Sequence, residues 1–331
     1  MTTNTEPVRL PPRRLAVAPM MNRTDRHFRY LMRLITRRTW LYTEMVVARG
    51  VVRGDAQKLL AYNGEEHPVA LQLGGHEPAV LADAARLAYA HGYDEVNLNI
   101  GCPSPRVSAG RMGACLMEEP GLVADCVAAM REASPLPVTV KTRLGIDHED
   151  SLEFLCRFVE CVAAAGCRTF IIHARKAWLN GVSPKANRNV PPLDYPRVAH
   201  VKRMYPELEI IVNGGIADLD GAAGLLAGVD GVMLGRGAYA SPLMFATADA
   251  RFYGETTGHE PRRAQVLTGY LHYLRSCVAR GEKLGPALRH VPAILGGVPG
   301  ARRVRARLGA LAGTQDVAGV ERALMPILEA G

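Results

Sequence analysis

The sequence of 331 residues is poor in aromatic side chains, which make up 6% of it, and has no apolar run of the ~18 residues that a membrane span needs. Its seven cysteines form no C-x-x-C pair, so we expect reduced thiols and no metal site. No predicted strand is followed by a G-x-G-x-x-G turn, which disfavours a Rossmann fold. Residues 1–14 lack the apolar segment of a secretory signal, so we expect a loose lead-in and a cytoplasmic protein.

The charge that is present is unevenly distributed along the chain. Residues 251–331 contain 12 Lys and Arg against 6 Asp and Glu, which gives this segment +6 of the net +8 of the whole chain. A basic segment beside a nearly neutral body is typical of a region that binds a polyanion, and equally of a solvated surface.

Eight short apolar runs alternate with helical patterns through the first 240 residues, which predicts an α/β TIM barrel rather than an open doubly wound sheet. The predicted strands are Leu15–Pro19, Trp40–Tyr42, Val69–Leu73, Glu95–Ile100, Val138–Lys141, Thr169–His173, Glu209–Val212 and Gly231–Leu234. The predicted helices are Arg26–Thr36, Ala79–His91, Gly121–Ala133, Ser151–Ala165, one from Asp218 to about Gly228, Arg262–Arg280 and Ala301–Leu311. We therefore expect a barrel over residues 1–245 and a small all-α domain over residues 250–331.

In a TIM barrel the reactive groups lie where the strands end. The chain places there Pro19, Met20, Gln72, Asn99 with Cys102, Lys141, His173, Asn213, Gly214, Gly215, Gly235 and Arg236. The glycines after the last two strands, together with Arg236, predict a phosphate site, although the same glycines would also serve simple sharp turns.

Gln72 and Lys141 near such a phosphate site favour flavin mononucleotide. The amide of Gln72 can pair with the pyrimidine edge of the isoalloxazine, and the ammonium group of Lys141 can offset the negative charge that gathers there on reduction. A lysine at a strand end also suits a Schiff-base aldolase or a plain ion pair, so this residue alone does not decide between them.

Cys102 lies between Gly101 and Pro103, directly after a predicted strand. An ordinary thiol is mostly protonated at neutral pH, so it can act as a general acid, and no adjacent histidine marks it as a nucleophile. We therefore predict that Cys102 is a proton donor, with a small buried residue as the alternative. Cys115 is a second candidate in the same loop and is expected to pack.

Motifs along nearly the whole chain match those of one family. They are Ala18–Met21 with Thr24–Arg26, Leu41–Met45, His67–Gly75, Gly92–Ser104, Val138–Arg143, Phe170–Trp178, Pro191–Pro196 and Gly297–Arg303. On these segments the sequence resembles the tRNA-dihydrouridine synthases, and within them the A subfamily. Asn22 and Arg23 depart from the family pattern Met-Met-Asp-Trp-Thr-Asp, which puts any stacking role at that rim in doubt.

The resemblance implies an FMN-bound barrel and a helical tRNA-binding domain that reduce uridine to 5,6-dihydrouridine at positions 20/20a of the tRNA D loop. NADPH would reduce the flavin, hydride would pass from flavin N5 to C6, and Cys102 would protonate C5. It implies flavin contacts from Pro19, Met20, Gln72, Lys141, His173, Asn213, Gly214, Gly215, Gly235 and Arg236. It implies tRNA contacts from Asn99, Arg143, Lys185, Arg188, Arg302 and Arg305. The loop Arg175–Arg188 would hold phosphates, and Trp178 would shield the site.

Three other functions remain compatible with the residues themselves. A small-molecule FMN barrel oxidoreductase, similar to dihydroorotate dehydrogenase, uses the same scaffold but needs no basic tail. A flavin-free aldolase or isomerase, and an RNA-binding module without catalysis, are the others. A yellow protein excludes these last two, and tRNA-dependent oxidation of NADPH separates the first from a tRNA-modifying enzyme.

Overall fold

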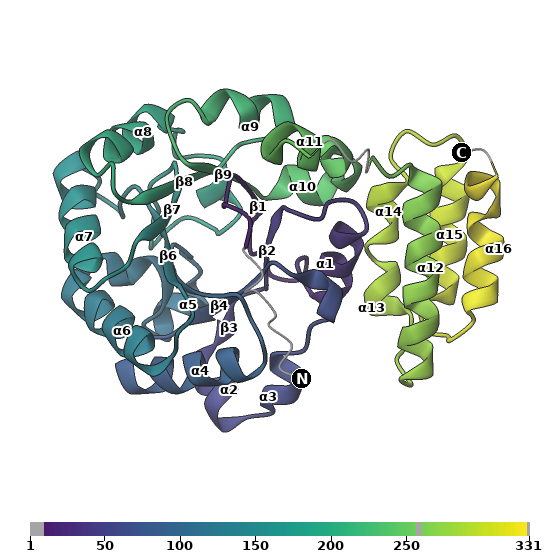
Figure 1. Cartoon of the computed structure of the whole chain (residues 1–331), viewed down its shortest axis with the longest axis horizontal. Helices are drawn as coiled ribbons and strands as arrows, with labels where there is room; N and C mark the ends of the chain where they lie inside the picture. The colour runs from purple at the N-terminus through teal and green to yellow at the C-terminus, as the bar shows by residue number, and fades with distance from the viewer. Residues whose placement is uncertain (1–9, 256–259, 330–331) are drawn as a thin grey trace, which may run out of the picture.

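The computed structural model of the chain describes residues 10–255 and 260–329 and shows a barrel with a bundle of helices beside it (Figure 1). The barrel strands are β1 (Leu15–Val17), β2 (Trp40–Tyr42), β4 (Val69–Gly74), β5 (Glu95–Ile100), β6 (Val138–Arg143), β7 (Thr169–His173), β8 (Glu209–Asn213) and β9 (Gly231–Leu234). All pair in parallel, and the pairing of β2 with β4 closes the ring. The eight predicted strands are thus confirmed, with ends displaced by at most two residues. The two-residue strand β3 (Val46–Val47), which pairs with β4, was not expected.

Helices and short turns surround the barrel. The helices are α1 (Arg26–Arg33), α2 (Ala48–Arg53), α3 (Ala56–Leu59), α4 (Pro78–Ala90), α5 (Pro105–Ala109), α6 (Pro120–Ala133), α7 (Leu152–Ala164), α8 (Tyr195–Met204), α9 (Leu219–Leu225), α10 (Arg236–Ala240) and α11 (Ala248–Tyr253). The 3-10 turns are Gly64–Glu66, Gly113–Glu118, Ala186–Arg188 and Pro242–Thr247. Asp25, Ser151 and Asp218 are the N-caps of α1, α7 and α9, because each side chain accepts a hydrogen bond from a backbone N–H three residues on.

Arg13 closes the end of the barrel where the strands begin. Its guanidinium donates to the carboxylates of Glu95 (2.6 Å) and Glu209 (3.0 Å) and lies 4.3 Å from the centroid of the Trp40 ring. The indole N–H of Trp40 donates in turn to the carbonyl of Pro11 at 2.8 Å. The expectation of a loose lead-in is therefore wrong for residues 10–14, because two buried barrel residues hold them in place. Residues 1–9 lie outside the described part of the chain.

The C-terminal region consists of helices packed side by side next to the barrel (Figure 1). They are α12 (Arg263–Ala279), α13 (Gly285–Leu288), α14 (Val291–Ile294), α15 (Ala301–Leu311) and α16 (Val317–Leu328). The helices expected at 262–280 and 301–311 are confirmed, whereas α13, α14 and α16 were missed. Two of these have only four residues each, which is too short for a helical period to be visible.

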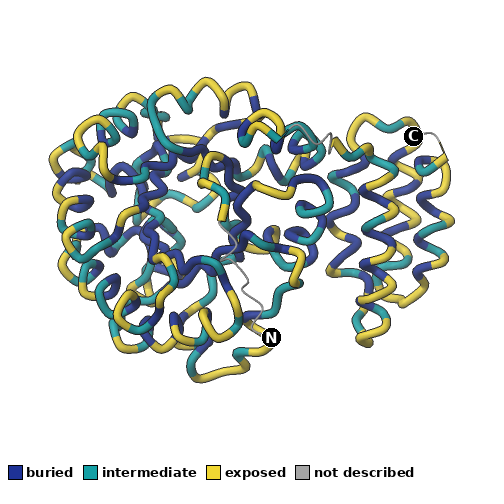
Figure 2. Tube along the Cα trace, in the orientation of Figure 1, coloured by how far each residue is buried: buried dark blue, intermediate teal, exposed yellow. Residues whose placement is uncertain are grey.

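Helix α1 joins the barrel to this region. The Tyr30 ring of α1 stacks on Tyr273 of α12 with centroids 4.0 Å apart, and the Phe28 ring lies 5.6 Å from that of His290. These contacts make a buried layer that runs without interruption from one part into the other (Figure 2). Within the barrel part, the hydroxyl of Tyr253 in α11 accepts a hydrogen bond from the Leu15 N–H of β1 (3.2 Å) and donates one to the Leu15 carbonyl (3.1 Å). Across residues 10–255 and 260–329, no helix has the length and apolarity to cross a bilayer.

Candidate active site

Cys102 lies in the turn that follows β5 and is half-buried. The side-chain oxygen of Asn99 accepts hydrogen bonds from the backbone N–H groups of Gly101 (3.1 Å) and Cys102 (3.0 Å). From the other side, the guanidinium of Arg143 donates to the carbonyl of Gly101 at 3.0 Å. The turn that carries the thiol is therefore fixed by side chains of two neighbouring strands.

A second loop packs against the backbone of Cys102. The N–H of Ala114 donates to the Cys102 carbonyl at 3.0 Å, and Gly113 beside it has φ +76°. A Cβ at Gly113 would lie 2.4 Å from that carbonyl oxygen, so only glycine fits there. The thiol of Cys115 donates to the carbonyl of Met112 at 3.2 Å, and burial raises its pKa, as suits the packing role expected of it.

A chain of hydrogen-bonded side chains runs down the barrel from the Cys102 turn. Asn99 donates to Gln72, Gln72 donates to Asn97, and Asn97 donates to Thr139, each at 2.8 Å. Thr139 donates to Glu95 at 2.5 Å. Glu95 is the carboxylate bound by Arg13. These hydrogen bonds therefore run from the end of the barrel where the strands finish, here called the mouth, to the end where the strands begin.

Sequence reasoning missed the lower half of this chain. Glu95, Asn97 and Asn99 occupy alternate positions of β5, and alternate residues of a strand lie on one face. Three polar residues in that register, within an otherwise apolar strand, were the available signal of a polar line inside the barrel.

Lys141 lies on β6, where it pairs in register with Asn99 of the neighbouring strand β5, and it donates to the side-chain oxygen of Asn213 at 3.0 Å. The amide nitrogen of Asn213 donates to the carbonyl of Met233 at 2.7 Å, which fixes its orientation. Burial, assisted by repulsion from Arg143, lowers the pKa of Lys141 to about 7, and the proximity of Cys102 acts in the opposite direction. The side chain is therefore able to gain or lose a proton near neutral pH.

His173 ends β7 next to Lys141. Burial, followed by the positive charges of Arg143 and Lys141, lowers the pKa of His173 well below its usual value, so the imidazole is neutral at physiological pH. Gly214 lies directly against the ring and has φ +112°. A Cβ at Gly214 would come within 2.4 Å of the imidazole Cδ2, which explains why glycine follows β8.

The remaining strand-end residues of the predicted cofactor site lie on the same side of the mouth, because β7, β8, β9 and β1 are consecutive in the sheet. Pro19 and Met20 follow β1, and a Cβ at Gly235 would lie 3.6 Å from the Met20 sulfur. Arg236 is exposed and donates to the Asn189 side chain at 2.7 Å. The site therefore suits an anionic group. It offers the cations Lys141 and Arg236, the neutral imidazole of His173, and a glycine cradle, by which we mean the glycines after β8 and β9, where a Cβ would fill the space.

The residues expected to contact tRNA lie in three separate places. Arg143 is only 3% exposed. Besides the carbonyl of Gly101, it donates to the carbonyls of Lys176 (3.2 Å) and Asn187 (3.0 Å), so this buried guanidinium stabilises the turn after β5 and the loop after β7. Asn99 is in the barrel, as described above. The exposed members are Lys185 and Arg188 in the loop after β7, and Arg302 and Arg305 on α15.

The loop that contains Lys185 is closed by the buried side chain of Asn187. Its amide nitrogen donates to the carbonyl of Trp178 (2.8 Å), and its oxygen accepts from the Trp178 N–H (2.7 Å). The Trp178 ring is half-buried, with the Lys176 ammonium 4.3 Å from its centroid. The loop is thus held as an ordered flap, and Asn187 is a positioning residue that the sequence did not reveal.

One group of potential metal ligands occurs among the described residues, where α1 meets the C-terminal end of α12. Ligand atoms of His27, Cys277 and Glu282 lie within 4.8 Å of one another. Glu282, however, already pairs with Arg26 (2.7 Å) and Arg280 (2.8 Å), so two guanidinium groups already balance its charge. The absence of a functional metal stays a prediction.

Comparison with solved structures supports the barrel. The chain superposes on a 2-naphthoyl-CoA reductase with a TM-score of 0.54 at 12% sequence identity. The superposition covers 71% of this chain and 49% of that one, so the chain spans about half the length of the reductase. At this identity the likeness concerns the fold alone.

Sequence comparison identifies the family. The model of the dihydrouridine synthase family matches residues 16–329. The chain is 50% identical over 328 residues to the tRNA-dihydrouridine(20/20a) synthase of Salmonella typhimurium, covering 98% of each chain. It is 52% identical over 294 residues to the enzyme of the same name from Escherichia coli K12, covering 88% of this chain and 84% of that one. These matches confirm the resemblance found in the motifs, and the chain belongs to the dihydrouridine synthase family.

Proposed function

We propose that this protein reduces uridine to 5,6-dihydrouridine at positions 20/20a of tRNA in the cytoplasm, with bound FMN as cofactor and NADPH as reductant. The observation that carries the proposal is the Cys102 thiol, held half-buried at the barrel mouth beside Lys141 and His173 in a chain of this family. A sulfur in that place is accessible to a substrate, and its turn is fixed on both sides.

The residues around the mouth fit FMN. Gln72 and Lys141 would face the isoalloxazine, while the backbone of Gly214, Gly215 and Gly235 with Arg236 would hold the phosphate, and Pro19, Met20, His173 and Asn213 would complete the pocket. The fit rests on the glycine cradle beside His173 and on cations that no carboxylate among the described residues neutralises. When bound, FMN supplies the hydride that adds to C6 of uracil.

Cys102 supplies the proton. The C5=C6 bond of uracil is conjugated to the C4 carbonyl, so addition at C6 places negative charge on C5 and O4. Cys102 protonates C5 as a general acid, and neutral His173 donates a hydrogen bond toward the charge on the carbonyl oxygen. Asn99 acts through Cys102, because it holds the turn that carries the thiol.

The helical region supplies the hold on tRNA. The target uridine must leave its stack to reach the mouth, and cations around the mouth must hold the backbone meanwhile. We assign these contacts to four exposed side chains: Lys185 and Arg188 beside the barrel, and Arg302 and Arg305 on α15. The barrel, residues 1–245, is thus the catalytic domain, and residues 250–331 are the tRNA-binding domain.

The direct test uses tRNA from a strain that lacks this protein. We expect the purified protein to be yellow, its flavin to be reduced by NADPH, and reoxidation to be accelerated by the unmodified tRNA. Dihydrouridine, mapped by sequencing, should appear at positions 20 and 20a. A flavin-loaded protein that leaves these positions as uridine would refute the proposal, and a protein that binds no flavin would refute its chemistry.

The pKa of Lys141 predicts how FMN binding depends on pH. At pH 8 an amine with a pKa of about 7 is mostly neutral in the free protein. An anionic, electron-rich ligand favours the ammonium form and raises this pKa, so binding takes up protons and weakens as pH rises above 7. Calorimetry at pH 8 in two buffers of different ionisation enthalpy should show net proton uptake for wild type and less for Lys141→Met. Equal uptake by both proteins would contradict the assignment.

A further inference from the structure

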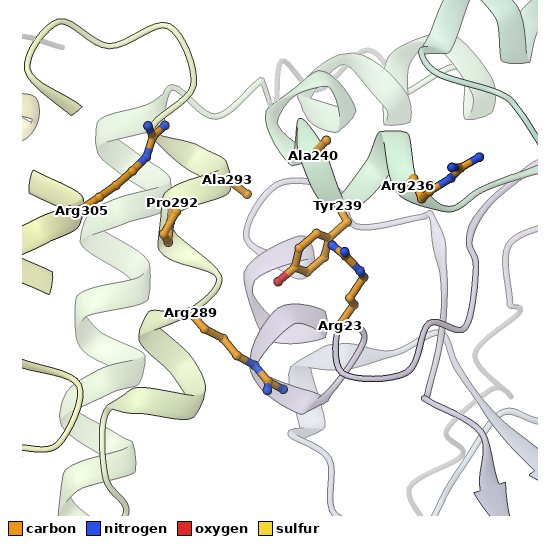
Figure 3. A pocket seen from close by; sticks show the side chains of 8 residues that line it. All are labelled: Arg23, Arg236, Tyr239, Ala240, Arg289, Pro292, Ala293 and Arg305. Carbon is orange, nitrogen blue, oxygen red and sulfur yellow. The ribbon is translucent and has the colours of Figure 1, made fainter. Parts of the chain in front are cut away.

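A pocket of about 440 Å³ opens at the seam between the barrel and the helical region (Figure 3). Four arginines line it. Arg23 follows β1 and Arg236 follows β9 on the barrel side, while Arg289 and Arg305 come from the helical side. Because its walls come from both parts, the pocket exists only when the two are docked.

The charges in this pocket are poorly compensated. Arg289 pairs with Asp25, which also accepts a hydrogen bond from His290 at 2.9 Å. Arg236 donates to neutral groups, and Arg305 donates to a backbone carbonyl at 3.3 Å. No carboxylate among the described residues forms an ion pair with Arg23, Arg236 or Arg305. Several unpaired guanidinium groups around one pocket favour an anion with oxygens arranged for forked hydrogen bonds, such as a phosphate.

One wall of the pocket is a rigid flat surface. The guanidinium of Arg23 lies 4.4 Å from the centroid of the Tyr239 ring, and the two stack in Figure 3. Tyr239 is held from behind by Phe28, with ring centroids 5.0 Å apart, and its hydroxyl lies 3.2 Å from Nδ1 of buried His290. The opposite wall includes the apolar side chains of Pro292 and Ala293. A guanidinium stacked on one side keeps its other face available for a planar group.

We propose that the seam pocket binds one nucleotide of the tRNA other than the uridine that is reduced. Its phosphate is held by Arg305, which forms no ion pair among the described residues, and its base stacks on the free face of Arg23. A nucleotide is the ligand that combines an anion with a planar ring, and the pocket volume is within the range of small-molecule sites. The inference rests on the proposed function, because it takes the anion to be RNA.

This assignment gives a role to a departure noted in the sequence. Arg23 stands where the family pattern has tryptophan. Both side chains present a flat face, and arginine adds a positive charge at the pocket. The chain therefore keeps a stacking surface at this rim and gains a contact whose strength depends on salt.

The test compares tRNA binding by full-length, flavin-loaded variants at several salt concentrations. Arg23→Ala should raise the Kd for unmodified tRNA about tenfold, and Arg23→Lys, which keeps the charge without the flat face, about threefold. Arg305→Ala should raise the Kd and lower the slope of log Kd against log salt by about one. Arg157→Ala is the matched control, since it removes an exposed arginine on α7, on the side of the barrel away from the helical region (Figure 1). Equal thermal stability of the four variants verifies that each is folded.

The outcomes separate this inference from the proposed function. If wild type modifies tRNA while Arg23→Ala and Arg305→Ala bind it as Arg157→Ala does, the pocket assignment and the tRNA contact of Arg305 are wrong, and the proposed catalytic activity stands. If these variants instead raise the KM for NADPH, the pocket binds the phosphates of the reductant and the assignment to tRNA is overturned. If wild type neither binds nor modifies tRNA, both proposals fall.

Discussion

The Cys102→Ala variant should be a yellow, folded enzyme, and NADPH should still reduce its flavin. Its formation of dihydrouridine should fall by a factor of about 10² to 10⁴, which is the usual contribution of a positioned general acid. The loss arises because the thiol is the group proposed to lie over C5, whereas Lys141, which can also release a proton near neutral pH, donates its hydrogen bond to Asn213. His173 is neutral, and Asn99 already uses its side-chain oxygen on the turn. The measurement is single-turnover product yield with pre-reduced enzyme and unmodified tRNA.

Cys115→Ala is the control for this result. Cys115 is a half-buried thiol in the neighbouring loop, and its only hydrogen bond among the described residues is to the carbonyl of Met112. This variant should keep product formation within about threefold of wild type. A Cys102→Ala enzyme with an undiminished single-turnover yield would mean that water or another side chain delivers the proton.

Glu95→Ala should lower the free energy of unfolding by about 3 to 5 kcal/mol, the range for removing one partner of a buried ion pair. Glu95 is fully buried and accepts from Arg13, from the Tyr42 hydroxyl at 2.9 Å and from Thr139. Without the carboxylate, two buried hydroxyl groups and a guanidinium lose their acceptor inside the barrel. Urea denaturation followed by circular dichroism measures the effect.

Glu209→Ala provides the comparison. Glu209 also accepts from Arg13, at 3.0 Å, and from Thr169 at 2.7 Å, but its side chain is 27% exposed, so water can replace these bonds. We expect a loss of about 1 kcal/mol. If the two variants were equally destabilised, burial of the carboxylate would not be what makes Glu95 important.

The barrel was predictable because parallel strands covered on both faces are continuous apolar runs, as in Val69–Gly74. The strand-end rule then located the residues of the mouth. Helix α16 and the two four-residue helices were missed, since glycine and proline interrupt their pattern and tertiary contacts decide their form. Strand β3 is too short to leave any periodic signal.

The polar line inside the barrel and the seam pocket were beyond prediction for different reasons. Asn97 and Thr139 meet only because β5 and β6 pair in a register that brings Asn97 opposite Thr139. Arg23 and Arg305 are 282 positions apart in the numbering, and their approach depends on how the helical region docks. The register of the strands and the docking of the helical region depend on contacts between distant parts of the folded chain. Local sequence patterns do not encode these contacts.

Helix α1 belongs to the barrel by chain order, yet Phe28 and Tyr30 pack into the C-terminal helices. If two relatives exchanged their C-terminal regions, α1 of one protein would therefore pack against C-terminal helices of the other, and these two surfaces would not be complementary. A chimaera that carried residues 22–33 along with its new helices would preserve the fit. Recombination points for engineering tRNA preference thus lie on both sides of α1, and a single cut near residue 256 would be a poor choice.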